Sequence, residues 1–123
     1  MDRAGGRADV RFGKASRLLR RSEFLAVQQG GRRLYGGELL VLSRESGGDH
    51  PRLGITVPGK VANAVTRNRV KRWVREAFRG VADSLPPVDL VVIARSGAGA
   101  VGLAGARRAL EAARDRLASG KGE

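Results

Sequence analysis

The chain has 123 residues, enough for about one domain with a modest core, and it carries a formal net charge of +12. Cysteine is absent, which excludes a disulfide framework, a thiolate metal site and a cysteine nucleophile. Apolar runs stay far below the roughly 18 residues of a membrane span, and the N-terminus lacks the apolar centre of a signal peptide. These features predict a cytoplasmic protein with no membrane partner.

Positive charge is concentrated in two parts of the chain. Residues 1–33 contain nine basic and three acidic side chains, and residues 60–80 contain seven and one. The rest of the chain is close to neutral. Clustering of this kind is expected of a surface that binds a polyanion, whereas charge that only keeps a protein soluble would be spread more evenly.

The N-terminal part is predicted to contain a flexible start and a short helix. Residues 1–10 are rich in glycine and arginine, and we expect them to be flexible. Residues 16–29 contain a helix for which Ser22 is a suitable N-cap, and the glycines at 30 and 31 end it. Its apolar face is thin, so this helix must pack against another element.

Three apolar segments are predicted to be strands. Residues 39–42 form a short apolar run, and residues 52–57 alternate in the way that is typical of a strand with one covered face. Residues 89–94 are the most apolar and β-branched run, which favours an interior strand. A further short strand is expected near residues 33–34.

Residues 64–79 are predicted to form a helix with two different faces. The apolar positions follow the helical repeat and must be buried: Val70, Trp73, Val74, Ala77 and Phe78. Polar and cationic positions lie on the opposite side: Asn68, Arg72, Arg75 and Arg79, with Lys71 beside them. A rigid row of cations suits a polyanion, because guanidinium groups pair with phosphate oxygens. This pattern favours a protein that binds nucleic acid.

The order of elements predicts the fold class. A last helix is expected over residues 103–117, and the segment from 52 to 94 reads as a strand–helix–strand unit. We therefore expect an α/β (α+β) two-layer sandwich, with a small, mainly antiparallel sheet covered by helices on at least one face. Residues 11–118 would form this single domain, and residues 119–123 a flexible tail.

The sequence offers little for an autonomous active site. The one histidine, His50, lies in a polar loop, and Asp83 and Asp89 are better explained as helix-end and strand-entry residues than as an acid–base pair. Residues 97–102 contain a G-x-G-x-x-G string between a strand and a helix, but the second strand with a ribose-binding acid is missing. We expect no catalytic residue and no metal ligand.

The segment from Asn63 to Phe78, Asn-Ala-Val-x-Arg-Asn-Arg-x-Lys-Arg-x-x-Arg-Glu-Ala-Phe, resembles the signature of the protein subunit of bacterial ribonuclease P. The strand at 52–57 followed by Lys60, the segment 16–24 and the strand at 89–95 resemble that family as well, so the resemblance covers about residues 11–118. It implies a sandwich whose strand–helix–strand crossover is left-handed. It also implies a protein that assists a catalytic RNA in removing the 5′ leader of precursor tRNA. The RNA would perform the hydrolysis with Mg²⁺, and the protein itself would bind no cofactor.

The resemblance assigns roles to individual residues. Contacts with the catalytic RNA would come from Lys60, Arg67, Asn68, Arg69, Lys71, Arg72 and Arg75. The single-stranded leader would lie in a cleft between the first helix and the sheet, against Phe24, with phosphate contacts from Arg17, Arg20 and Arg21. From the residues alone, Phe24 could equally pack inward or stack on an unpaired base. The chain departs from the family at Gln28 and Leu42, where aromatic residues are common, and at Pro58-Gly59, where Ser-Lys is expected.

Other functions fit the charge less well. The main alternative is a ribosomal-type protein or RNA chaperone that binds RNA without a role in cleavage. A DNA-reading recognition helix is disfavoured, because residues 64–79 lack a preceding helix at helix-turn-helix spacing. A membrane-surface helix is disfavoured as well, because strands on both sides bury its apolar face within the fold.

Overall fold

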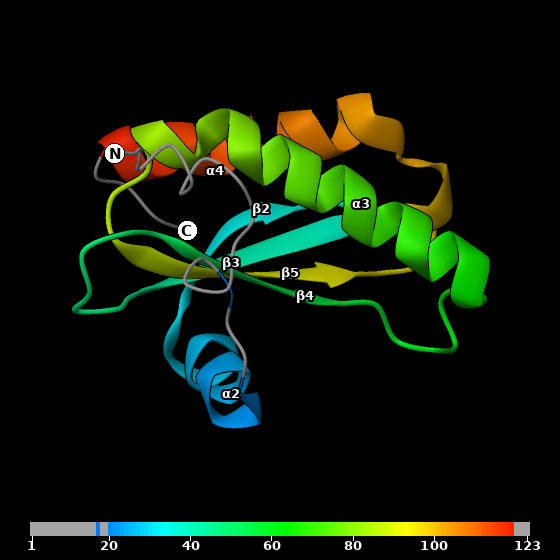
Figure 1. Cartoon of the computed structure of the whole chain (residues 1–123), viewed down its shortest axis with the longest axis horizontal. Helices are drawn as coiled ribbons and strands as arrows, with labels where there is room; N and C mark the ends of the chain where they lie inside the picture. The colour runs from blue at the N-terminus through cyan, green and yellow to red at the C-terminus, as the bar shows by residue number, and fades with distance from the viewer. Residues whose placement is uncertain (1–16, 18–19, 120–123) are drawn as a thin grey trace, which may run out of the picture.

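The computed structural model describes residue 17 and residues 20–119 (Figure 1). Of the segments predicted to be flexible, 1–10 and 119–123, residues 1–10 and 120–123 lie outside the described residues, and Ser119 belongs to the last helix. In chain order the elements are α2 (Arg21–Gly30), β2 (Arg32–Gly36), β3 (Leu39–Glu45), β4 (Arg52–Thr56), α3 (Ala64–Val81), β5 (Val88–Ala94) and α4 (Gly102–Ser119), with short 3-10 turns η2 (Ala82–Ser84) and η3 (Ala98–Ala100). None of the described helices is long and apolar enough to cross a membrane.

The four strands form one mixed sheet in the order β2-β3-β5-β4. β3 pairs antiparallel with both β2 and β5, and β4 pairs parallel with β5. The sheet is therefore mainly antiparallel, as predicted, and the short strand expected near residues 33–34 is present as β2. β4 lies at one edge, where an isolated bridge joins Leu53 to Arg17. The parallel pair β4 and β5 is connected through α3, which confirms the strand–helix–strand unit.

The main core lies between the sheet and the layer formed by α3 and α4 (Figure 1). The stripe predicted on α3 is buried at Val70, Val74, Ala77 and Phe78, whereas Trp73 is only partly buried at its margin. β5 is the interior strand, with Leu90, Val91 and Val92 fully buried. Burial of a side chain of this size contributes about 1.5–3 kcal/mol, so the core fixes the position of α3 firmly.

α2 packs on the opposite face of the sheet (Figure 1). Val27 and Val91 are buried there, with Phe24, Leu42 and Ile93 partly buried around them. The sheet, α3 and α4 form the two predicted layers of an α+β fold, and α2 adds a small layer on the second face. The part of this face beyond α2 keeps apolar side chains partly exposed.

α2 begins earlier than the sequence predicted. Its N-cap is Arg20, and the Arg20 backbone amide donates a hydrogen bond of 3.0 Å to Glu23 Oε1. The prediction of Ser22 as the N-cap was wrong, because Glu23 stands three residues after Arg20, where a carboxylate reaches back to the cap amide. The C-terminal end agrees with the prediction: Gly31 caps the helix, and its amide donates to Val27 O at 2.8 Å.

Candidate nucleic-acid interface

The first turn of α3 is fixed by its cap and by the core beneath it. Asn63 is the N-cap, and its side-chain oxygen accepts a hydrogen bond of 2.9 Å from the Thr66 amide. Such a cap stabilises a helix by about 1 kcal/mol. Because the apolar side of α3 is buried, its polar side keeps a constant orientation toward solvent.

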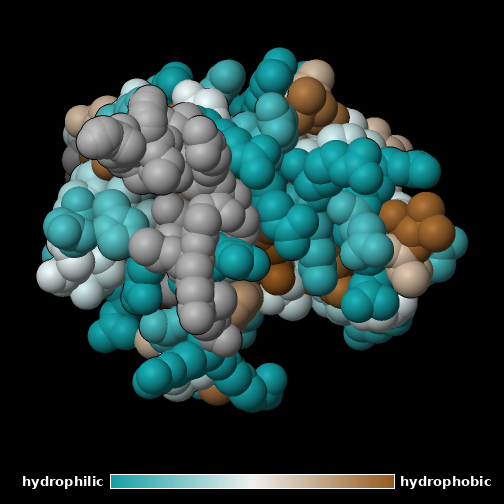
Figure 2. Space-filling view, in the orientation of Figure 1, coloured by the Kyte–Doolittle hydropathy of each residue, from teal (hydrophilic) through white to brown (hydrophobic). Residues whose placement is uncertain are grey.

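The polar side of α3 carries the residues predicted to bind RNA. The side chains of Asn68, Arg69 and Arg72 are exposed, and so is Lys60 in the turn before the helix. Arg67, Lys71 and Arg75 are partly buried along the same helix. We call this set of seven residues the α3 cationic face. Hydrophilic side chains gather over α3 in the view of Figure 2.

Arg67 differs from the other cations of the α3 cationic face. Its Nε atom is buried and has no hydrogen-bond partner among the described residues. An unpaired buried donor costs about 1–3 kcal/mol in the free protein.

The α3 cationic face ends before the C-terminus of the helix. Arg79 Nη1 lies 2.9 Å from Glu76 Oε1, so the charge of Arg79 is locally balanced. The sequence placed Arg79 on the same row as Arg72 and Arg75, and the structure separates it from them by this ion pair. Near the start of α3 the apolar side chain of Val65 is 67% exposed, so the surface there is both polar and apolar.

A second candidate surface lies between α2 and the sheet. Phe24, Leu42 and Ile93 pack against the buried pair Val27 and Val91, yet all three side chains remain partly exposed. Arg20 and Arg21 are exposed at the start of α2, and Arg17 is exposed beside β4. We call this surface the α2 groove. Figure 2 shows a concave outline next to α2. The surface combines partly exposed apolar side chains with exposed cations at the start of α2.

The residues at which the chain departs from the pattern that it resembles lie in or near the groove. Gln28 is exposed one turn after Phe24, and Leu42 forms part of the floor. Pro58 and Lys60 line a pocket of about 420 Å³ together with Ile93. Because Ile93 belongs to the floor of the α2 groove and Lys60 to the α3 cationic face, this pocket joins the two surfaces.

An ionic link attaches α2 to the sheet. The guanidinium group of Arg52 donates two hydrogen bonds of 2.9 Å to the carboxylate of Asp89 and one of 3.1 Å to Glu23 Oε2. These hydrogen bonds, led by those to Asp89, raise the pKa of Arg52 above its ordinary value, so its charge is permanent. Asp89 is therefore a structural ion-pair partner at the entry of β5. Sequence reasoning missed the link, because it depends on the register between β4 and β5.

The remaining titratable groups singled out in the sequence lie apart from both surfaces. His50 Nδ1 is 2.6 Å from Asp49 Oδ1 in the loop between β3 and β4, and this contact lowers the pKa of Asp49. Asp83 is exposed in η2. Within the described residues, no three His, Cys, Asp or Glu side chains come together as a metal site.

Comparisons with known proteins agree with this architecture. The family model described as Ribonuclease P matches residues 12–118. The ribonuclease P protein component of Citrifermentans bemidjiense is 42% identical over 87 residues, which are 71% of this chain and 75% of that protein. The ribonuclease P protein structure from Staphylococcus aureus has a TM-score of 0.75 at 30% identity, over 85% of this chain and 96% of that one. The corresponding structure from Thermotoga maritima has a TM-score of 0.71 at 36% identity, over 81% and 96%. The chain belongs to the ribonuclease P family of protein components.

Proposed function

We propose that this chain is the protein component of a bacterial ribonuclease P and that it binds two RNAs at once. The α3 cationic face would hold the catalytic RNA, and the α2 groove would hold the 5′ leader of precursor tRNA. The proposal is supported most by the pocket that Ile93 and Lys60 line, because this pocket connects the two surfaces. A substrate strand in the groove is thereby led toward the RNA bound on α3.

The α3 cationic face supports binding of a structured RNA. Its arginines stand on a helix fixed by the core, so little side-chain and backbone freedom remains to be lost on binding. Because Arg79 is paired with Glu76, we place the RNA over the N-terminal two-thirds of the helix.

The α2 groove supports binding of a single strand. Unpaired bases stack on aromatic and apolar surfaces, and Phe24, Leu42 and Ile93 offer such a surface without being fully buried. The exposed side chains of Arg20 and Arg21 would contact the phosphates of that strand. Stacking of this kind tolerates any base, as a protein that accepts many leaders requires.

We propose that the RNA carries out hydrolysis with Mg²⁺ in the RNA–protein holoenzyme. The protein would contribute positive charge and a fixed path for the leader. Positive charge from the protein replaces part of the cation atmosphere that two closely packed RNAs need, so the protein should matter most when Mg²⁺ is scarce.

Cleavage of a 5′-extended precursor tRNA by a bacterial ribonuclease P RNA at low Mg²⁺ tests the proposal. We expect cleavage at the mature 5′ end with RNA and protein together, and none with the protein alone. Arg69→Ala combined with Arg72→Ala should weaken the effect strongly, whereas Arg107→Ala combined with Arg116→Ala, on α4, removes the same charge and should weaken it little. Tight RNA binding without any stimulation of cleavage by a closely matched RNA would replace this function with RNA binding alone.

A further inference from the structure

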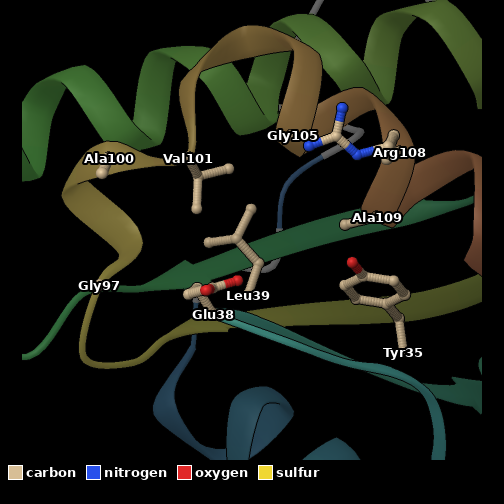
Figure 3. Close-up of a pocket in the computed structure, with 9 residues that line it drawn as sticks. All are labelled: Tyr35, Glu38, Leu39, Gly97, Ala100, Val101, Gly105, Arg108 and Ala109. Atoms are coloured by element: carbon tan, nitrogen blue, oxygen red, sulfur yellow. The ribbon is translucent and has the colours of Figure 1, made fainter.

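A pocket of about 200 Å³ lies on the α4 side of the sheet, between the β2–β3 turn and the start of α4 (Figure 3). Leu39, Val101 and Ala109 form apolar walls, and the polar groups at its rim belong to Tyr35, Glu38 and Arg108. It contains part of the glycine-rich segment 97–102, which neither of the proposed RNA surfaces uses.

Both sides of this pocket are held by hydrogen bonds. Arg95 donates from its backbone amide to Glu38 O at 2.8 Å and from its guanidinium group to Gly37 O at 3.0 and 2.7 Å. The opposite side is the η3 turn, in which the Val101 amide donates to Ala98 O at 3.1 Å. Because these bonds fix the backbone on both sides, the pocket is formed before any ligand binds.

Two glycines keep the pocket open. Gly97 has a φ of 92°, and a Cβ atom at this residue would lie 3.2 Å from Glu38 Cγ. A Cβ atom at Gly105 would collide with Val101 Cγ1. A side chain at either position would therefore strain the pocket or fill it.

The two charged side chains at the rim, those of Glu38 and Arg108, do not form an ion pair with each other. Glu38 stands on the β2–β3 turn and Arg108 on α4, with the pocket between them (Figure 3). Within the described part of the chain, neither side chain forms an ion pair or a side-chain hydrogen bond. The Tyr35 ring completes the rim beside them. The pocket thus offers a carboxylate that only accepts, a cation that only donates and an aromatic surface.

We propose that this pocket binds one unpaired guanine nucleotide. Guanine is the base whose Watson–Crick edge has two adjacent donors, N1–H and N2–H, and a carboxylate such as that of Glu38 can accept both. The other bases would turn an acceptor toward the carboxylate beside their single donor. Arg108 would contact the phosphate, and the Tyr35 ring would contact the face of the base.

The position of the pocket makes RNA the source of this guanine. The η3 turn packs against the first turn of α3, where a Cβ atom at Gly99 would lie 3.0 Å from Thr66 Cγ2. Thr66 directly precedes Arg67 on the α3 cationic face. An RNA strand that leaves that face over η3 would reach the pocket. The inference rests on the proposed function, because it takes an RNA bound on α3 as given.

The test is chemical probing of guanines in the assembled complex of protein, ribonuclease P RNA and precursor tRNA. Kethoxal reacts with N1 and N2 of unpaired guanine, the two atoms that the pocket would cover. We expect one guanine to be protected by the wild-type protein and to react in complexes with Glu38→Gln or Arg108→Ala. Glu45→Gln and Arg107→Ala change the same charges outside the pocket and should keep the protection. Circular dichroism and thermal unfolding would confirm that all four variants fold.

A base substitution gives the matching quantitative test. Replacing the protected guanine by inosine removes the N2 amine, and it should weaken binding of the wild-type protein about tenfold, as expected for loss of one bidentate contact. The Glu38→Gln protein, which has lost the acceptor pair, should bind the two RNAs equally.

The outcomes separate this proposal from the proposed function. If the protein restores cleavage and no guanine depends on Glu38, the pocket proposal fails and the function stands. If the protein neither binds the RNAs nor restores cleavage, both fail. Titration of the free protein with 5′-GMP and 5′-AMP, followed by NMR, identifies the source of the nucleotide. Saturable binding of 5′-GMP that requires Glu38, without a Glu38-dependent guanine in the RNAs, would assign the pocket to the free nucleotide and overturn the RNA assignment.

Discussion

Replacing Arg52 by methionine tests whether the ionic link positions α2 over the sheet. The substitution keeps most of the side-chain length and removes the guanidinium group that contacts Asp89 and Glu23. Both carboxylates then lose an ion-pair partner. We expect a less stable protein in which α2 is more weakly attached, with the α3 cationic face unchanged.

The size of the effect follows from the burial of the three side chains. Loss of one partner from a fully buried ion pair costs about 3–5 kcal/mol, because a charge is left without compensation. Here the side chains of Arg52, Glu23 and Asp89 are 29%, 26% and 12% exposed, so water reaches part of each carboxylate. We therefore expect Arg52→Met to lower the free energy of unfolding by about 2–3 kcal/mol, below the 5–15 kcal/mol that is typical of a domain.

Glu23→Gln separates the ion pair from the helix cap. Glutamine retains an oxygen that can accept the Arg20 amide, so the cap remains, but the negative charge facing Arg52 is lost. We expect a smaller destabilisation of about 0.5–1.5 kcal/mol. The double variant with Arg52→Met should be less destabilised than the sum of the two, because both changes remove the same contact.

Urea unfolding monitored by circular dichroism measures the stability of the variants, and gel-shift titrations with precursor and mature tRNA measure their function. The preference for precursor over mature tRNA should fall in Arg52→Met, while affinity for the catalytic RNA should remain. Arg79→Met is the matched control: it breaks an ion pair whose side chains are 40% and 49% exposed, and should cost about 0.5 kcal/mol or less. An unfolding free energy for Arg52→Met within about 0.5 kcal/mol of wild type, the range of an ordinary surface substitution, would refute the argument.

Three further outcomes are expected. Arg72→Ala should reduce the salt dependence of RNA binding by about 0.7–0.9 log unit per lost phosphate contact, the range from single strands to duplexes, and Arg79→Ala, whose charge is already balanced, by less; equal slopes across a KCl series would remove the distinction. Phe24→Ala should lower the affinity for precursor tRNA more than that for mature tRNA, by about 1–3 kcal/mol per unstacked base. Equal losses for both RNAs would make Phe24 a core residue only. His50→Ala should raise the pKa of Asp49 toward 3.8, because the His50 hydrogen bond lowers it. In the wild type, the lowered pKa of Asp49 stabilises the folded protein above pH 3.8, and this stabilisation is lost as the pH falls through the lowered pKa. Carbon-detected NMR titration of the Asp49 carboxyl group can measure the pKa.

The sequence predicted best those features that depend on local periodicity. The two faces of α3, the interior strand β5 and the end of α2 at its glycines all follow from patterns within a few turns or residues. The assignment of the cationic row to one side of α3 was possible because the 3.6-residue repeat places the apolar stripe opposite to it. The ends of the elements were predicted less accurately. The N-cap of α2 is Arg20, whose amide donates to Glu23, and not Ser22 as the sequence predicted.

Features that depend on contacts between distant segments could not be predicted. Arg52 and Asp89 are 37 residues apart and meet because β4 and β5 pair in parallel with these two residues in register. The same holds for the preformed pocket, whose walls come from the β2–β3 turn, η3 and α4. A row of charges also does not reveal which cations are already paired: Arg79 continues the pattern of α3, yet Glu76 one turn earlier balances it.

The position of α2 is the part of this fold that depends most on charge. Of its ten residues, only Val27 is fully buried, so apolar burial holds α2 far less firmly than it holds α3. A helix with so small a buried surface opens at low free-energy cost unless other contacts restrain it. The hydrogen bond between Arg52 and Glu23 supplies such a restraint in the first turn of α2, close in sequence to Arg20 and Arg21. The ion pair between Arg52 and Glu23 therefore adds to the small apolar contact that holds α2 on the sheet. If the α2 groove binds the leader as proposed, a change at Arg52 should alter the affinity for precursor tRNA without contact between Arg52 and the RNA.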